Sequence, residues 1–332
     1  MARIQLLAYS NGVGNSRDIH LLAQPLRDLG HELTVTLVSR GARRSRRWRL
    51  LAWWVRLRRA LGGGAAPPYD LNLMLEHVWP GYLTLARRNV LVPNPEWFDR
   101  HDRRLLPLLD GLWAKTRYSQ GLFEALGKPV SYTGFDSVDR CVATVARQAR
   151  FFHLAGKSRM KGTARLLALW SRHPEWPLLC VVLSRRLQAQ LPVADNIQYR
   201  SEYLEDAQLA QLQNAHLFHL CTSETEGWGH YIPEALSTGA VVIATDAPPM
   251  NELVGPDRGL LVAAREHGRQ HLAATYAFDE AALEAAVGQV LVLDGAQRQA
   301  LGTSARAWFL ANQQGFPERL RQALAASGVQ AA

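Results

Sequence analysis

The sequence predicts an α/β protein with two parallel β-sheets, each flanked by helices. Short apolar segments of strand length alternate with helix-length segments, and strands joined by helical crossovers form parallel sheets. The alternation restarts with a new apolar strand at residues 151–156, which indicates a second unit. The chain length of 332 residues fits two domains of ordinary size.

The first half contains six expected strands and one clear helix. The helix covers residues 19–29 and ends at Gly30, and the Gly- and Pro-rich tract 62–68 is expected to be a loop. The expected strands cover residues 4–9, 33–38, 71–75, 90–92, 111–114 and 130–132. No apolar run approaches the ~18 residues needed to cross a bilayer, and the start of the chain indicates a first strand rather than a signal peptide.

The second half repeats the pattern. A short helix follows Pro233 and ends at Gly239, and another helix runs to Leu324. The expected strands cover residues 151–156, 178–183, 197–200, 216–221, 241–244 and 260–262. In sheets of this kind ligands bind at the carboxyl ends of the strands, so loops after strands are the places to search for chemistry.

Residues 223–246 form the most informative segment. Glu226 lies in a loop tightened by Gly227 and Gly229, and Glu234 lies just inside the helix, after Pro233. Ionised carboxylates only accept hydrogen bonds, so at a strand–loop–helix junction they are suited to the hydroxyls of a sugar or a ribose.

The order E-G-W-G-x-x-x-P-E-A-L, followed by S-x-G-A-V-V-I-A-T, resembles the signature of group-1 glycosyltransferases, also called family 4 of the GT-B fold. These are retaining enzymes that use nucleotide sugars and have two Rossmann-like domains. The resemblance implies an acceptor-side domain over 1–140, a nucleotide-sugar-binding domain over 150–305 and a donor cleft between them. A C-terminal helix over 306–326 is expected to cross back onto the first domain.

The resemblance also assigns roles to the two carboxylates. Glu234 would bind the ribose hydroxyls of the donor. Glu226, the expected catalytic residue, would contact the transferred sugar, and its charge would favour the ring as the ring becomes cation-like. The donor-binding loop would also include Gly227, Trp228, Gly229 and His230.

A basic segment at residues 156–162 is predicted to hold the donor diphosphate. The sequence G-K-S-R-M-K-G resembles the family segment G-R-x-x-x-x-K-G, with Lys157 and Lys161 as the basic pair and Arg159 between them. It is one residue shorter and begins with Lys instead of Arg. No D-x-D triplet occurs in the chain, so we expect no metal and no cofactor, and the nucleotide diphosphate sugar is a substrate.

Two residues of the first half join the predicted site. Gly14 ends the segment Asn11-Gly-Val-Gly14, which resembles the glycine loop of the family, and a plain strand-to-helix turn is the alternative. His77 follows a strand, where the family often has a His near the donor sugar. We predict a catalytic role for His77, with a structural role as the alternative.

The net charge of +9 is concentrated in one segment, because residues 40–59 contain nine arginines and no acid. The remaining 29 basic residues balance 29 acidic ones. Arginine with tryptophan suits an anionic membrane surface or a lipid-linked acceptor, a nucleic-acid backbone, or simply a solvated helix face. The candidate surface comprises Arg43, Arg44, Arg46, Arg47, Trp53, Trp54, Arg56, Arg58 and Arg59.

Together these features predict a retaining glycosyltransferase that acts on a lipid-linked or cell-envelope glycan. The three cysteines are far apart and odd in number, which favours a reducing cytoplasm, with the arginine segment on the inner membrane face. Two alternatives are open. The protein could glycosylate modified bases in DNA, or it could bind a nucleotide or glycan without catalysis.

Overall fold

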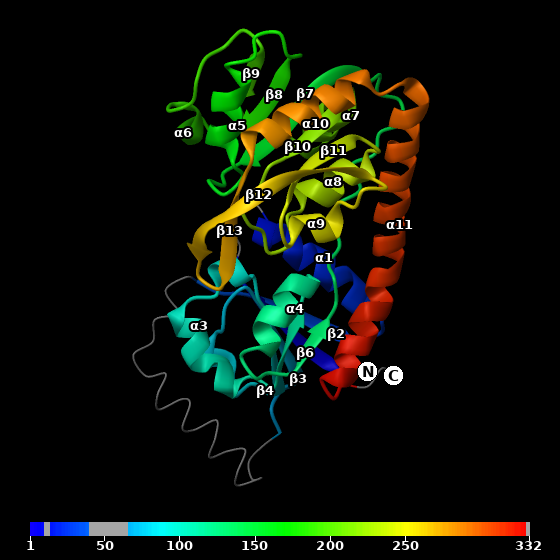
Figure 1. Cartoon of the computed structure of the whole chain (residues 1–332). Coiled ribbons are helices and arrows are strands. Elements are labelled where there is room, and N and C mark those ends of the chain that lie inside the picture. Colours follow the sequence, from blue (N-terminus) through cyan, green and yellow to red (C-terminus); the bar gives the residue numbers. More distant parts are fainter. Residues whose placement is uncertain (10–13, 40–65, 330–332) are drawn as a thin grey trace. The chain divides into compact units, whose positions relative to one another are not determined.

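The computed structural model describes residues 1–9, 14–39 and 66–329, which form two compact units (Figure 1). Unit 1 comprises Met1–Asp136, Gln270–Leu272 and Gln314–Ala332. Unit 2 comprises Ser137–Arg269 and Ala273–Gln313.

Unit 1 is built on a six-stranded sheet with the order β2-β1-β3-β4-β5-β6, and its described strands all pair in parallel. The strands are β1 (Arg3–Ala8), β2 (Glu32–Leu37), β3 (Tyr69–Leu75), β4 (Ala86–Val92), β5 (Gly111–Ala114) and β6 (Val130–Tyr132). The last five residues of β3 are all buried, which explains its continuous apolar run.

Two helices of unit 1 begin at recognisable caps. The side chain of Thr116 accepts a hydrogen bond from the backbone N–H of Ser119 and so starts α4, and Asp99 starts α3 in the same way. The helices are α1 (Gly14–Asp28), α3 (Arg100–Leu105) and α4 (Arg117–Glu124), with short 3-10 turns η2 (Pro80–Tyr82), η3 (Pro95–Trp97) and η4 (Leu106–Leu108).

Unit 2 is built on a seven-stranded sheet with the order β13-β12-β11-β10-β7-β8-β9. The six strands β12, β11, β10, β7, β8 and β9, which are neighbours in this order, pair in parallel. The strands are β7 (Gln148–Gly156), β8 (Leu179–Leu183), β9 (Ile197–Arg200), β10 (His216–Cys221), β11 (Val241–Asp246), β12 (Gly259–Gln270) and β13 (Ala273–Phe278). The strand order reverses between β7 and β10, so the loops after these two strands flank a crevice of the kind that binds ligands.

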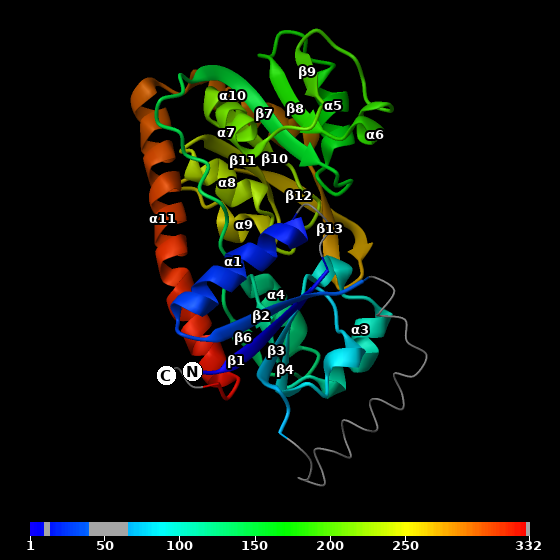
Figure 2. The ribbon, with the colours of Figure 1, turned by 180° about the vertical axis from the view of Figure 1, so that it is seen from behind.

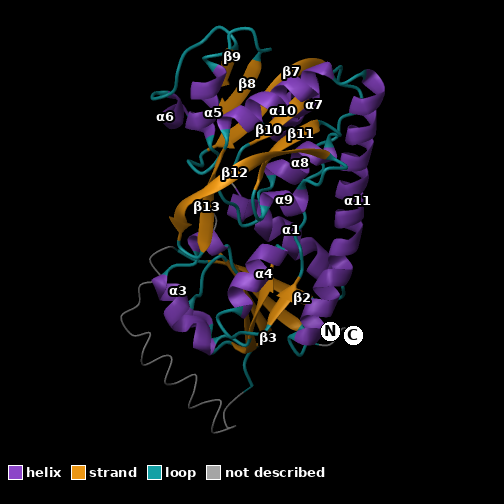
Figure 3. Cartoon of the chain, in the orientation of Figure 1, coloured by secondary structure: helices purple, strands orange, loops and turns teal. Residues whose placement is uncertain are grey.

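Helices pack along this second sheet. Figures 1 and 2 show α5 and α6 beside β8 and β9, and Figure 3 shows α7 and α10 lying along the strands β7, β10 and β11. The helices are α5 (Thr163–Trp170), α6 (Arg185–Gln188), α7 (Asp206–Ala215), α8 (Tyr231–Ser237), α9 (Met250–Leu253), α10 (Glu280–Val292) and α11 (Gly295–Ala326), whose last part belongs to unit 1. In the core the Phe151 ring lies 4.8 Å from the rings of both Trp170 and Phe218.

The predicted α/β class with parallel sheets is confirmed, and all twelve expected strands exist. Most ends agree within a few residues, but β4 begins at residue 86 instead of 90 and β12 continues to residue 270 instead of 262. One strand, β13, was not expected. It follows the last part of β12, residues 264–270, which are polar and mostly exposed. This part of β12 has no apolar alternation to reveal it. None of the described helices is long and apolar enough to cross a membrane.

Candidate functional site

Two loops meet at the reversal of strand order in unit 2. The loop 157–162 follows β7, and the loop 222–230 follows β10. The backbone N–H of Glu224 donates to the Met160 carbonyl at 2.8 Å, and the Thr222 hydroxyl donates to the Lys161 carbonyl at 3.0 Å. The structure therefore holds the predicted diphosphate segment directly against the predicted sugar-binding loop.

The closest contact between these loops is an ion pair between Lys161 and Glu226. The Lys161 Nζ atom bonds the Glu226 Oε1 atom, and the two side chains are 13% and 14% exposed. The ammonium also lies 3.6 Å from the centre of the Tyr231 ring, a favourable cation–π position. The pair is thus partly shielded from water but still reachable by a ligand.

A serine hydroxyl orients the Glu226 carboxylate. Ser223 Oγ donates to Glu226 Oε1 at 2.5 Å and lies 2.6 Å from the Tyr231 hydroxyl. Since Ser223 has one proton and gives it to the carboxylate, the Tyr231 hydroxyl must donate to Ser223. Burial raises the pKa of Tyr231 well above its ordinary value, which keeps this phenol protonated.

A basic cavity of about 460 Å³ opens beside the first loop. Lys157 and Arg159 line it together with Ser184, Arg186 and Leu187, which follow β8. The lining contains three cations and no acidic side chain. Within the described chain none of these three cations forms an ion pair. Such a cavity favours an anion, and a diphosphate is the anion for which the sequence predicted Lys157 and Arg159.

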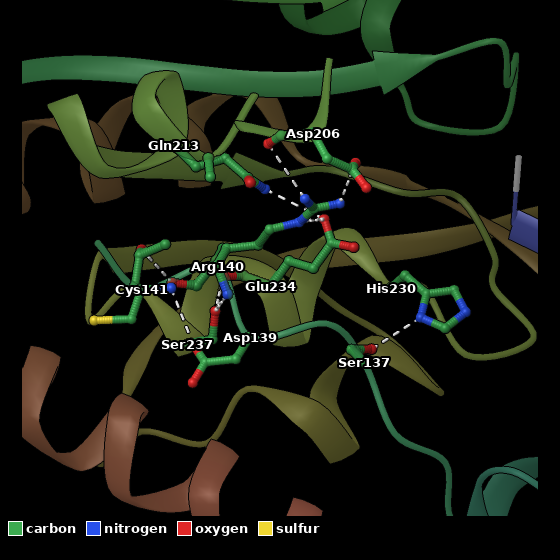
Figure 4. Close-up of polar contacts among 12 residues, drawn as sticks. Ser137, Asp139, Arg140, Cys141, Asp206, Gln213, His230, Glu234 and Ser237 are labelled. Carbon is green, nitrogen blue, oxygen red and sulfur yellow. Dashed lines mark hydrogen bonds and ion pairs between the residues drawn. The ribbon is translucent and has the colours of Figure 1, made fainter. Parts of the chain in front are cut away.

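The predicted ribose ligand Glu234 is enclosed. Its side chain is 0% exposed, with Oε2 3.7 Å from the Arg140 Nε atom, and Gln213 Nε2 donates to Oε2 at 3.3 Å (Figure 4). A ribose hydroxyl could reach this carboxylate only after neighbouring side chains shift. The ribose contact therefore stays a prediction that requires a local rearrangement.

The remaining residues of the loop 222–230 are held by one hydroxyl. Ser137 Oγ accepts from Trp228 Nε1 at 3.0 Å and lies 2.9 Å from His230 Nδ1 (Figure 4 shows the second contact). Trp228 is buried and His230 half-buried. Gly227 is buried, and Gly229 adopts φ +78°, where an added Cβ would lie 3.0 Å from the Glu226 Cγ atom. Glycine at 229 leaves room for the Glu226 side chain.

His77 and Gly14 lie in unit 1. His77 Nδ1 lies 2.9 Å from Asp102 Oδ2, and the His77 side chain is 15% exposed. Asp102 itself is buried and accepts the backbone N–H of Val78. The carboxylate fixes the imidazole with its Nδ1–H toward Asp102, which is the arrangement that orients a functional histidine. Gly14 is the first residue of α1.

The arginine segment with Arg43, Arg44, Arg46, Arg47, Trp53, Trp54, Arg56, Arg58 and Arg59 lies outside the described residues. Among the residues that are described, no group of three or more His, Cys, Asp or Glu is placed to hold a metal ion.

Sequence reasoning missed several polar partners at these sites. They are Ser137, Arg140, Asp102, Ser223, Tyr231 and Arg186. Ser223 and Tyr231 flank Glu226 in the motif, so polar neighbours of a predicted catalytic residue were the available signal. The others approach from segments distant in sequence, and nothing local indicated them.

Comparison with solved structures identifies proteins of the same fold. Sucrose-phosphate synthase from Thermosynechococcus elongatus matches with a TM-score of 0.70 at 15% identity, over 98% of this chain and 100% of that chain. HepE from Anabaena, solved with UDP and glucose, matches with a TM-score of 0.68 at 18% identity, over 98% and 100%. A glycosyltransferase from Rickettsia africae matches with a TM-score of 0.65 at 14% identity, over 98% and 97%. These likenesses confirm the predicted GT-B fold.

Neither protein-family models nor curated protein sequences match the chain.

Proposed function

We propose that this protein is a retaining glycosyltransferase that moves a sugar from a nucleoside diphosphate to an acceptor hydroxyl. One observation carries the proposal. The Lys161–Glu226 pair sits where the loops after β7 and β10 meet, beside a cavity whose charged lining residues are all cations. An anionic group and a polyhydroxyl group can thus be bound side by side.

The charges of this pair match the two ends of the bond that breaks. When the bond between sugar and phosphate breaks, the electron pair stays on the diphosphate, and the sugar ring becomes cation-like. Lys161 complements the growing negative charge, and Glu226 complements the positive ring. Lys157 and Arg159 bind the diphosphate in the adjoining cavity, which needs no metal in this proposal.

The remaining assignments complete the donor site. Glu234 binds the ribose hydroxyls, and the loop from Gly227 to His230 lines the sugar pocket. His77 contacts the sugar, and Asp102 orients the His77 ring. Gly14 lets backbone approach the donor. HepE, a structural neighbour, was also solved with UDP-glucose. UDP-glucose is therefore the first donor to test, before the corresponding GDP-, dTDP- and ADP-sugars.

The acceptor proposal rests on the sequence of the arginine segment. Nine arginines without an acid within residues 40–59 suit an anionic leaflet, so we place the acceptor among lipid-linked or cell-envelope glycans at the inner membrane face. A steep effect of duplex DNA on activity would instead support the DNA alternative.

The decisive variant is Glu226→Gln. It should lower turnover about a hundredfold or more, as loss of one preorganised charge at a reacting centre does. The dissociation constant of the free nucleoside diphosphate should hardly change, because Glu226 contacts the sugar. Lys161→Met should lower the turnover and also weaken the binding of the free nucleoside diphosphate. Donor hydrolysis and calorimetry measure the two quantities, and a wild-type protein that binds nucleotide sugars without ever cleaving them would support the non-catalytic alternative.

A further inference from the structure

Arg140 is an almost fully buried cation whose guanidinium contacts two residues, Asp206 and Glu234. Its side chain is 3% exposed, and its Nη2 atom donates to Asp206 Oδ1 at 3.0 Å (Figure 4). Nη1 donates to the Asp206 carbonyl at 3.4 Å. The Nε atom faces Glu234 Oε2 at 3.7 Å. The guanidinium thus joins a buried carboxylate to an exposed one, since the Asp206 side chain is 79% exposed.

The buried end of this network is incompletely bonded. Arg140 Nε and the Gln213 Oε1 atom are both buried and have no hydrogen-bond partner among the described residues. Buried polar atoms normally have partners, and each one left without costs free energy. An unbonded donor and an unbonded acceptor beside one carboxylate match a hydroxyl-bearing ligand, because each hydroxyl both donates and accepts.

Arg140 belongs to a short segment that touches the predicted donor loop at several points. Ser137 bonds Trp228 and His230, and the Arg140 backbone N–H donates to Ser237 Oγ at 2.9 Å. The neighbouring Asp139 forms a two-pronged bond to Arg306 in α11 at 2.6 and 2.7 Å. These contacts fix the backbone from which the Arg140 side chain extends.

We propose that Arg140 is a positioning residue for donor recognition, which acts through Glu234. This inference rests on the proposed function and adds a specificity role to it. Arg140 holds the Glu234 carboxylate in place while the site is empty. When the donor binds, the ribose hydroxyls donate to the Glu234 carboxylate. They also supply hydrogen-bond partners to Arg140 Nε and Gln213 Oε1. The long contact of 3.7 Å is ionic rather than directional, so it can rearrange without breaking a hydrogen bond.

The test compares ribose with deoxyribose. Calorimetry on the full chain would use UDP, ADP and GDP, each beside its 2′-deoxy form, and inorganic pyrophosphate. The wild-type protein should prefer the ribose form of its nucleotide by about tenfold, as expected for hydrogen bonds to a charged group. In Arg140→Met this preference should fall below about threefold, while pyrophosphate binds as before. Arg140→Lys should restore most of it.

Two further variants make the result specific. Arg172→Met removes an exposed arginine that pairs with Glu280, and it should leave the preference unchanged. In a Glu234→Gln background, Arg140→Met should have no additional effect on the preference, because a residue acting through another is not additive with it. If Arg140→Met fails to fold, Asp206→Ala frees the exposed end of the guanidinium and should lower the preference partway.

Three results would overturn the inference. The first is a full ribose preference in Arg140→Met, or in Asp206→Ala if Arg140→Met does not fold. The second is an additive loss in the Glu234→Gln background. The third is a wild-type protein that binds nucleoside diphosphates without discriminating ribose, which leaves the proposed function standing. A wild-type protein that binds no nucleoside diphosphate refutes the proposed function itself.

Discussion

Substitution of Gly162 by alanine should separate the two loops of the candidate site. Gly162 adopts φ +65°, and an added Cβ would lie 2.3 Å from the Thr222 carbonyl oxygen. The carbonyl oxygen belongs to the backbone and the Cβ is fixed directly to it, so neither can move aside as the end of a long side chain would. The same carbonyl belongs to the loop that carries Glu226, and Lys161 immediately precedes Gly162.

Gly156 provides a matched control for this substitution. It adopts φ +59°, but an added Cβ would meet no heavy atom within 4 Å. A left-handed alanine costs roughly 1–2 kcal/mol of folding free energy, which both variants share. Steric crowding should cost Gly162→Ala roughly 1–3 kcal/mol more.

Urea unfolding followed by circular dichroism measures this difference, and calorimetry with UDP measures its effect on the site. We expect Gly162→Ala to be the less stable variant and to bind the nucleotide more weakly. Equal stability of the two variants would refute the argument, because it would mean that the close backbone approach has no energetic consequence.

Three other predictions concern acid stability, membrane binding and stereochemistry. Burial lowers the pKa of His153 from 6.5 to about 4. The unfolded chain therefore takes up this proton first as the pH falls, and His153 alone should lower the unfolding free energy by roughly 3 kcal/mol between pH 6.5 and 4, a slope that His153→Asn should reduce. Replacing the seven arginines of the candidate surface by glutamine should release the protein from anionic liposomes with little effect on donor hydrolysis; a variant that still sediments would exclude the membrane role. The product should keep the anomeric configuration of the donor by NMR, with activity unaffected by EDTA, and an inverted centre or a metal requirement would contradict the corresponding assignment.

The fold was predictable because each strand and helix can be recognised from the residues of one local segment. Strands such as β10 and β11 are short apolar runs between turn residues, and their alternation with helices determines a parallel sheet. The strand β13 was not predicted because its partner, the second half of β12, is polar and mostly exposed.

The candidate site was predictable only where its residues share one segment. Glu226 and Lys161 stand out because each lies in a motif, yet their direct contact spans 65 positions of sequence. The Glu234 carboxylate faces Arg140, which lies 94 positions away and carries no motif of its own. A single sequence contains no signal for such pairings, because they result from the three-dimensional path of the chain.

The hydroxyl of Ser223 gives the hydrogen bonds around Glu226 a direction. Protons point from Tyr231 to Ser223 and from Ser223 to the carboxylate, so the chain ends on a group that only accepts. A neutral amide at position 226 can continue this order only with its oxygen facing both Ser223 and Lys161. The direction of the Tyr231 hydroxyl proton is therefore set, through Ser223, by the carboxylate of Glu226. An NMR signal assigned to Tyr231 would then follow changes at Glu226, the predicted catalytic residue.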